Sequence, residues 1–231
     1  MGLRQAYGRK EKDRFSVIMA KKRYLKLEYS IFIFVIIGVM LLLVPISFGN
    51  SVQAGFISKW NEKFNKIEYM FSVINAHVDD DILSSMKKAQ NSNEREKLLI
   101  QLVKPYIRVN TANKPKRYRP RYLNGSKINK KDLYYFEDVY FAENNSSIVG
   151  IKNIHTINPS DPLFVMMVDV NGILPPNRWG KDIFGLRIYD GGRIKPFGED
   201  LDMDKIKKDC SKTGTGGACS YYYTIGGGFD D

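Results

Sequence analysis

The chain has 231 residues, with 36 Lys or Arg, 25 Asp or Glu and a formal net charge of +11, and its length accommodates one domain together with an anchor. The charge is uneven, because residues 1–26 hold nine basic and two acidic residues, whereas the other 205 residues hold 27 basic and 23 acidic residues. This pattern argues against a chain that is basic throughout. It indicates a topology signal at the N-terminus, and a nucleic-acid-binding basic tail is the alternative.

An uncharged run of 20 residues, Tyr29 to Phe48, follows the basic segment. With a rise of about 1.5 Å per residue, a helix of this length spans the ~30 Å hydrocarbon core of a bilayer. We therefore expect residues 27–48 to cross the cell membrane once. By the positive-inside rule, the basic leader, residues 1–26, stays in the cytoplasm and the C-terminal domain is extracytoplasmic.

A cleaved secretory signal peptide is the alternative for this region. Small residues at 52–54 precede Gly55 in a way that is typical of a signal peptidase site. In that case the apolar run would be absent from the mature protein.

Apolar residues recur at spacings of three and four along the helical region that we expect over residues 49–109. This spacing puts them on one stripe of a helix, with charged residues on the opposite face. The stripe contains Ile57, Trp60, Phe64, Ile67, Phe71, Ile74 and Val78. We expect one helix from about Glu28 to about Ala76 whose second half packs on the protein's own domain; a two-stranded coiled coil is the alternative. One or two short helices are expected over residues 82–107, with a break at Lys104-Pro105.

The remaining region, residues 110–231, is predicted to be rich in β-structure. A polar, turn-rich loop covers residues 110–131. Aromatic and β-branched segments then predict strands at 133–142, 147–157, 163–170, 183–189 and 193–196, and a final strand in the C-terminal segment YYYTIGGGFDD. A long helix followed by antiparallel strands predicts an α+β fold, with the helix packed on a small sheet.

Two cysteines, Cys210 and Cys219, lie nine residues apart with a small, flexible segment between them. Outside the cytoplasm a disulfide is the expected state, and a pair of free thiols is the alternative. The chain has only two histidines and no nucleophile, phosphate-binding or paired-metal motif. We therefore do not expect an enzyme.

Two segments together resemble the type IV pilins and type II secretion pseudopilins. The first is LEYSIFIFVIIGVMLLLVP, in which Glu28 lies four residues and Pro45 twenty-one residues after the aromatic Tyr24. The second is DVNGILPPNRWGKDIFGLRI, which is similar to a segment of the globular domain in pilin-like and secretion-system proteins. The resemblance implies a subunit, or a membrane-held assembly component, of a pilus or secretion filament, with the membrane and homologous subunits as partners.

The same resemblance gives roles to Glu28 and Pro45. In the family the glutamate is placed to pair with the N-terminal amine of a neighbouring subunit, and the proline loosens the helix where it leaves the lipid. Alternatively, Glu28 lies among the headgroups, paired with a nearby cation, and Pro45 simply ends the membrane helix. At position 23 this chain has Arg where the family has a small residue before the cleavage point. An unprocessed chain would be a membrane-tethered binding module that does not polymerise.

Asp169, Asn171 and Asp182 offer the hard oxygen ligands that calcium prefers. Some pseudopilins that this chain resembles bind calcium in the corresponding region. The alternative is turn chemistry, because Asn171-Gly172 is a common hairpin turn.

The segment from Lys97 to Lys131 contains eleven basic residues and no acidic residue. Within it, basic and aromatic side chains alternate at Lys116, Arg117, Tyr118, Arg119, Arg121 and Tyr122. Such a pattern can bind DNA or an anionic cell-wall polymer through its phosphates and bases. The alternative is an ordinary solvated loop.

Overall fold

The computed structural model describes residues 3–77, 91–154 and 161–229. For residues 3–27, 41–50, 77, 92 and 190 it describes the backbone alone. The chain divides into two compact units, Met1–Val52 and Gln53–Asp231. The first unit consists of helix, and the second contains all of the β-structure.

One helix, α1, runs from Leu3 to His77 without interruption and connects the two units. It begins well before the predicted start near Glu28, because the leader is rich in strong helix formers such as Arg, Lys, Glu and Ala. Pro45 lies inside α1. Among the residues that the structure describes, no helix is both long and apolar enough to cross a membrane. The predicted transmembrane segment, residues 27–48, lies partly outside this set, because the side chains of residues 27 and 41–48 are not described.

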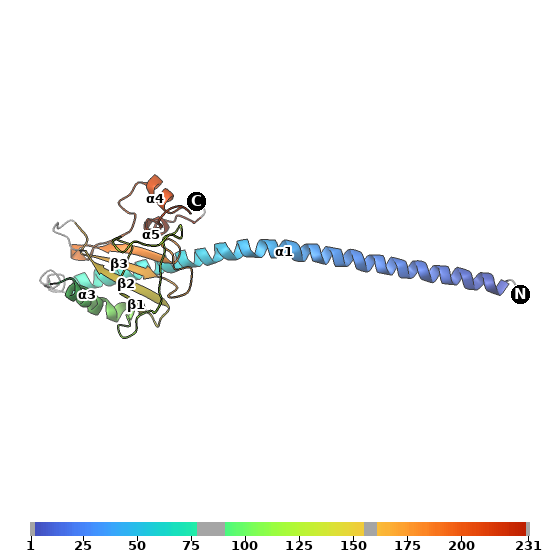
Figure 1. The fold of residues 1–231 in the computed structure, drawn as a ribbon, viewed down its shortest axis with the longest axis horizontal. Helices are drawn as coiled ribbons and strands as arrows, with labels where there is room; N and C mark the ends of the chain where they lie inside the picture. Colours follow the sequence, from blue (N-terminus) through green and yellow to red (C-terminus); the bar gives the residue numbers. More distant parts are fainter. Residues whose placement is uncertain (1–2, 78–90, 155–160, 230–231) are drawn as a thin grey trace. The chain divides into compact units, whose positions relative to one another are not determined.

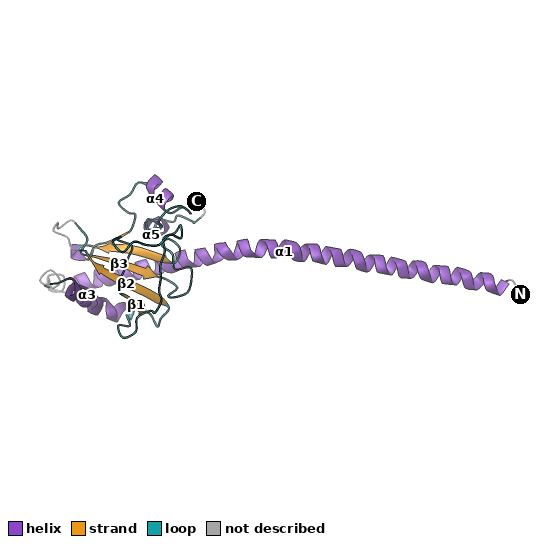
Figure 2. Cartoon of the chain, viewed as in Figure 1, coloured by secondary structure: helices purple, strands orange, loops and turns teal. Residues whose placement is uncertain are grey.

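The C-terminal unit is built on a five-stranded antiparallel sheet in which each strand pairs with its neighbour in sequence (Figure 2). Its strands are β1 (Val139–Ala142), β2 (Ser147–Asn153), β3 (Phe164–Asp169), β4 (Ile183–Ile188) and β5 (Ile194–Pro196). The prediction of an α+β fold with an antiparallel sheet is therefore confirmed.

Both faces of this sheet are buried. Along β3, side chains alternate between two cores, with Met166 and Val168 in one and Val165 and Met167 in the other. The first core lies under α1 and under α3 (Ser92–Ile107), which cover the same face (Figure 1). The second core is closed by chain from the loop before β1, including Tyr134 and Phe136.

The apolar stripe of α1 packs on the protein's own sheet, as predicted. Trp60 is fully buried, and Ile67, Phe71 and Ile74 are at most 4% exposed. The Trp60 ring stacks on Phe184 of β4 at a centroid distance of 4.8 Å, and its Nε1 donates a hydrogen bond to the Ser220 carbonyl oxygen at 2.8 Å. Val78, the last residue of the predicted stripe, lies outside the described residues.

Two predictions about local structure need correction, and a third cannot be compared with the described residues. The strand expected over residues 133–142 is paired only from Val139, because the preceding aromatic residues cover the second core as irregular chain. The predicted break at Lys104-Pro105 is wrong, since α3 continues for two residues beyond Pro105, to Ile107. The part of the helical prediction at residues 82–90 lies outside the described residues.

The predicted C-terminal strand is also wrong. A short helix, α5 (Cys219–Thr224), occupies this segment, and α4 (Met203–Asp209) precedes it after a 3-10 turn at Asp190–Gly192 and strand β5. Cys219, Tyr222 and Tyr223 are buried together, and their spacing of three and four residues puts them on one helical face. Burial of this face therefore overrides the β-propensity of three successive tyrosines.

Candidate functional site

The connection between β3 and β4, residues 170–182, lies within the segment DVNGILPPNRWGKDIFGLRI. Asp169 ends β3 and pairs in register with Ile183, the first residue of β4. The chain between them turns at Gly172 and Gly180, whose φ angles of +73° and +74° suit glycine because other residues lack an easy left-handed conformation. The glycines of this segment are thus required by the turn itself.

Two buried carboxylates hold this connection from inside. Asp182 accepts hydrogen bonds from the backbone N–H groups of Asn177 at 2.8 Å and Arg178 at 2.7 Å. Asp169 accepts from the Tyr118 hydroxyl at 2.8 Å and from the Asn171 backbone N–H at 3.1 Å. Both aspartates have no exposed surface. Each carboxylate therefore fixes the part of the connection nearest to its own end.

Burial controls the titration of this pair. It raises the pKa of Asp182 to about 6, and the backbone N–H donors only partly oppose the effect. Burial, together with the nearby charge of Asp182, raises the pKa of Asp169 well above its ordinary value. The pKa of the Tyr118 hydroxyl is likewise raised, mainly by burial and then by the adjacent Asp169. Burial therefore disfavours the charged forms of all three groups.

This donor set fits a calcium ion poorly. Each of the four carboxylate oxygens of Asp169 and Asp182 already accepts a hydrogen bond, and only the Asn171 Oδ1 atom is buried without a partner. Within the described ranges no group of three or more Asp, Glu, His or Cys side chains is placed to hold a metal. The hydrogen bonds favour the turn role that the sequence left open for Asp169, Asn171 and Asp182.

The predicted disulfide between Cys210 and Cys219 is present. Its loop is packed against the β3–β4 connection, since a Cβ atom at Gly180 would lie 2.6 Å from the Cys219 sulfur. Asp209 fastens the same loop by accepting hydrogen bonds from the backbone N–H groups of Thr215 at 2.9 Å and Ala218 at 2.8 Å. The disulfide therefore supports the connection as well as the C-terminus.

The basic segment predicted to bind an anionic polymer lies beside the same connection. The Arg121 backbone N–H donates to the Asn177 carbonyl at 3.0 Å, and the Trp179 N–H donates to the Arg121 carbonyl at 3.0 Å. Side chains of all four predicted basic residues, Lys116, Arg117, Arg119 and Arg121, are exposed.

The two tyrosines of that prediction are used internally. Tyr118 donates its hydroxyl to Asp169, and Tyr122 is 9% exposed and donates its hydroxyl to Asp132. Stacking of these rings on bases would need both to leave their contacts. The polymer-binding prediction is therefore left with its basic residues alone.

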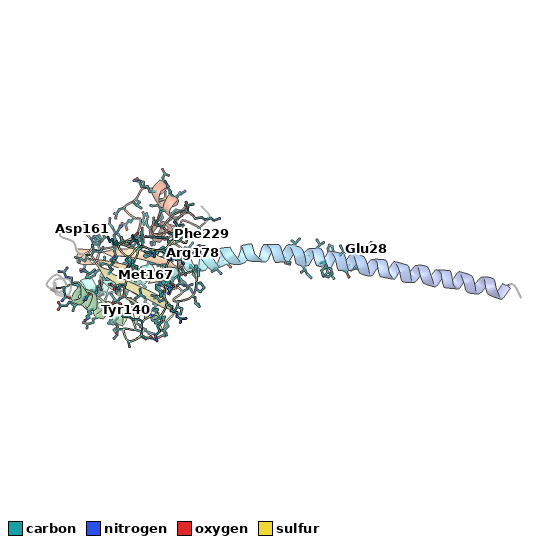
Figure 3. The ribbon with its side chains drawn as sticks, viewed as in Figure 1. Glu28, Tyr140, Asp161, Met167, Arg178 and Phe229 are labelled. Carbon is teal, nitrogen blue, oxygen red and sulfur yellow. A yellow bond between two sulfur atoms is a disulfide. The ribbon has the colours of Figure 1, made fainter. Side chains whose placement is uncertain are left out.

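The sequence reasoning missed four residues on the same connection. Ile173 and Leu174 are 52% and 65% exposed, and Arg178 and Lys181 follow them. Arg178 and Phe229 are labelled in Figure 3, and the Lys181 ammonium lies over the Phe229 ring, 5.3 Å from its centroid. A pair of large aliphatic residues directly before two prolines was the available signal, because a hairpin turn normally has polar residues there.

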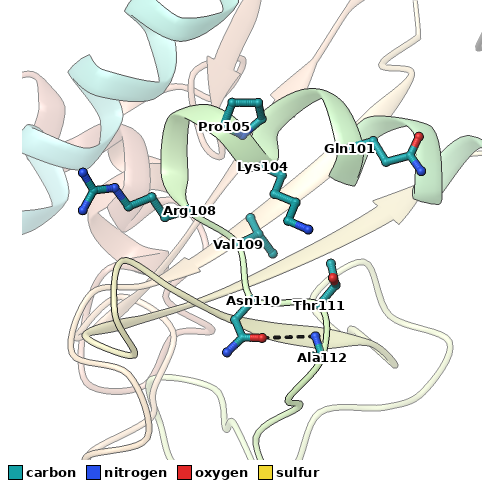
Figure 4. A pocket seen from close by; sticks show the side chains of 8 residues that line it. All are labelled: Gln101, Lys104, Pro105, Arg108, Val109, Asn110, Thr111 and Ala112. Atoms are coloured by element: carbon teal, nitrogen blue, oxygen red, sulfur yellow. Dashed lines mark hydrogen bonds between the residues drawn. The ribbon is translucent and has the colours of Figure 1, made fainter.

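A separate cavity of about 640 Å³ lies where α3 ends (Figure 4). Lys104 and Arg108 lie on it, and the Asn110 side-chain oxygen accepts a hydrogen bond from the Ala112 backbone N–H at 3.1 Å. The cavity has no carboxylate or imidazole among its lining residues. It therefore offers positive charge without groups for acid–base chemistry.

The two predicted assembly residues lie in the N-terminal unit. Glu28 is exposed on α1, and Pro45 lies among the residues whose side chains are not described. Between them, ten large apolar residues from Tyr29 to Met40 are 42% to 73% exposed. This part of α1 thus presents apolar surface that the protein's own fold does not cover.

Comparison of the chain with known protein families, with characterised proteins and with solved structures finds no match.

Proposed function

We propose that this protein is a pilin-like or pseudopilin-like subunit, or a membrane-held assembly component, of a type IV pilus or type II secretion filament. In this proposal residues 27–48 of α1 anchor the chain in the cell membrane and pack against the same helix of neighbouring subunits. The globular unit then faces outward from the membrane. The proposal starts from the two segments that resemble the family, and its main support is the exposed apolar surface of α1.

The central observation is the contrast between two parts of α1. In the part that belongs to the globular unit, the apolar stripe is buried, with Trp60 fully buried. In the part from residue 28 to residue 40, every residue is exposed, and most of the residues are large and apolar. A soluble monomer rarely exposes an apolar surface of this extent. Lipid tails and the equivalent helices of other subunits are the covers that fit a surface that is apolar on all sides.

Glu28 supports assembly over anchoring alone. A carboxylate at the edge of a membrane helix costs free energy unless a positive charge is supplied, about 2.5 kcal/mol or more for a charge at the bilayer centre. An N-terminal amine on a neighbouring subunit would supply that charge and fix the register between helices. Replacing Glu28 by Ala should therefore weaken assembly more than anchoring.

Cysteine cross-linking in the native membrane tests this proposal. Ile33→Cys introduces a thiol on the exposed apolar surface, and Tyr69→Cys is the control, because Tyr69 is 70% exposed on the second half of the same helix. Packed helices lie about 8–10 Å apart, so oxidation should link Ile33→Cys chains into dimers, whereas Tyr69→Cys chains stay monomeric. Adding Glu28→Ala should reduce the cross-link, and the exposed Glu68→Ala should not. Absence of cross-linking at position 33 would contradict assembly.

The basic residues favour a second candidate, a membrane-tethered module that does not polymerise and binds DNA or a cell-wall polymer. Arg117 and Arg119 are exposed and form no ion pair with any described residue, in contrast to Lys114, which pairs with Asp138 at 2.5 Å. Under this candidate, removing the charges of Lys116, Arg117, Arg119 and Arg121 should lower the affinity for DNA or wall polymer, and position 33 should not cross-link.

A further inference from the structure

The exposed aliphatic pair Ile173 and Leu174 lies at the tip of a rigidly held turn. The Asn171 side-chain amide donates to the Pro175 carbonyl oxygen at 3.2 Å, across the base of the tip. Asp182 holds the part of the connection that returns to β4, because its carboxylate accepts hydrogen bonds from the backbone N–H groups of Asn177 and Arg178. The two aliphatic side chains therefore stay in water in the monomer, because the turn is held in place around them.

Five basic residues belong to this connection or to the chain beside it. The Arg121 backbone is hydrogen-bonded to Asn177 and Trp179, so the segment that contains Arg117, Arg119 and Arg121 runs beside the connection, and Arg178 and Lys181 lie on the connection itself. None of these five residues forms an ion pair with a described residue, whereas Arg187 and Lys195 elsewhere on the unit pair with Asp200 at 3.0 Å and 2.6 Å. Asp169 and Asp182, the two acids at the ends of the connection, are buried and already accept hydrogen bonds. The exposed charges of the cations therefore remain available to an anion.

The cations are also crowded together. Burial lowers the pKa of the Lys181 ammonium, and so do the neighbouring charges of Arg178 and Lys212, whereas the charge of Asp182 partly opposes them. Such mutual repulsion is relieved when an anion binds among the cations. Exposed aliphatic side chains and cations on one connection are the combination by which proteins lie on an anionic membrane surface.

The position of this surface along the chain favours lipid as the partner. The Gln53 side-chain amide donates to the Lys181 carbonyl oxygen at 3.4 Å, so the β3–β4 connection lies where α1 enters the globular unit. Gln53 is five residues beyond Phe48, the end of the uncharged run. Five helical residues extend about 7.5 Å, and a headgroup layer is about 5–7 Å thick. If the run spans the bilayer, the helix therefore reaches Gln53 at about the outer boundary of the headgroups.

We propose that the surface formed by Ile173, Leu174, Arg117, Arg119, Arg121, Arg178 and Lys181 is a second membrane contact that binds anionic phospholipid headgroups, with the aliphatic tip inserted among them. This proposal rests on the proposed function, because it needs α1 to anchor the chain. The contact would hold the globular unit at the membrane until the subunit leaves the bilayer. We call this surface the headgroup surface.

The test uses the full chain in nanodiscs of phosphatidylcholine, with or without phosphatidylglycerol. The two native cysteines form the disulfide, so one introduced cysteine can be labelled with an environment-sensitive fluorophore. Leu174→Cys reports on the headgroup surface, and Leu201→Cys, on an exposed leucine before α4, is the control. Quenching by nitroxide-labelled lipid should be strong at position 174 with phosphatidylglycerol, weak without it and weak at position 201.

A charge variant tests the role of the cations. Arg117→Gln, Arg119→Gln and Lys181→Gln together should shift the contact equilibrium by about a hundredfold and abolish the quenching at position 174. The matched control is Lys205→Gln, Lys207→Gln and Lys208→Gln on α4, which removes the same charge from another surface and should leave the quenching unchanged. High salt should act like the first variant.

The outcomes separate this inference from the proposed function. The same fluorophore is also placed on Ile33→Cys, within the predicted anchor. If the lipid quenches the label at position 33 but not the label at position 174, the headgroup surface is overturned and the anchor is left intact. An unquenched label at position 33 would overturn the anchor itself. A label at position 174 that responds to added DNA but not to phosphatidylglycerol would overturn the lipid assignment in favour of polymer binding.

Discussion

Trp60 gives the sharpest test of how α1 is attached to the globular unit. Its side chain is fully buried, stacks on Phe184 at 4.8 Å and donates to the Ser220 carbonyl oxygen at 2.8 Å. Replacement by Ala removes the ring, leaves a cavity and deprives a buried carbonyl of its donor. Substitutions of this kind cost about 3–5 kcal/mol. For a domain of this size, about 4 kcal/mol lowers the Tm by roughly 8–16 °C.

The assay is thermal unfolding of the detergent-solubilised full chain, followed by near-ultraviolet circular dichroism of the tyrosines, most of which lie in the globular unit. Far-ultraviolet signals are less suitable because α1 dominates them. Trp60→Phe, which keeps an aromatic ring but not the donor, should lose only about 1–3 kcal/mol. Tyr69→Ala, on the exposed face of the same helix, should stay within about 0.5 kcal/mol of the parent chain.

The coiled-coil alternative predicts the opposite pattern. If Trp60 faced a second chain, Trp60→Ala would weaken self-association and leave the Tm of the globular unit almost unchanged. A Tm shift of less than about 2 °C, corresponding to less than about 1 kcal/mol, would therefore refute the packing described for α1.

Three further predictions concern the β3–β4 connection and its support. Replacing both Cys210 and Cys219 by Ser should lower the unfolding free energy by about 2–3 kcal/mol in chemical denaturation, since the closed loop is short. Gly180→Ala should cost about 2–4 kcal/mol in the same assay, because its Cβ would lie 2.6 Å from the Cys219 sulfur at a φ of +74°. Because burial raises the pKa of Asp182 from 3.8 to about 6, its stabilising contribution is complete below pH 4 and is lost as the pH rises to about 6. The free-energy difference between the parent chain and Asp182→Asn should accordingly change by roughly 3 kcal/mol in favour of the variant between pH 4 and pH 7, and a constant difference would contradict the raised pKa.

Most of the sheet could be predicted from the sequence because its strands are bounded by clear turn residues. Apolar runs such as the one at Phe164–Asp169, ending at Asn171-Gly172, leave little choice of boundary. The stripe of α1 was predictable for a similar reason, since a spacing of three and four defines one helical face. In both cases the local pattern and the tertiary contacts agree.

The failures occur where tertiary contacts override local preference. Three successive tyrosines have high β-propensity, but burial of Cys219, Tyr222 and Tyr223 on one side produces α5. The aromatic residues before β1 were assigned to a strand, but Tyr134 and Phe136 instead close the second core around Trp179. A single sequence does not reveal which apolar residues will cover a second face of a sheet.

The candidate site was predicted only in part for the same reason. Sequence spacing brought Asp169, Asn171 and Asp182 together, but their hydrogen bonds to backbone N–H groups depend on the folded turn. The basic residues were found by composition, whereas the association of Arg121 with Asn177 is a long-range contact. The headgroup surface therefore became visible only in the folded unit.

The intact mass and N-terminal sequence of the mature protein from its native membrane test the central claim most directly. If the proposed function is right, the mature chain begins at Tyr24 and retains Glu28 and the uncharged run from Tyr29 to Phe48. A chain beginning at Met1 would keep the anchor but favour the module that does not polymerise. A chain beginning at Gly55 would contradict the account, because the apolar run would then have served only as a signal peptide.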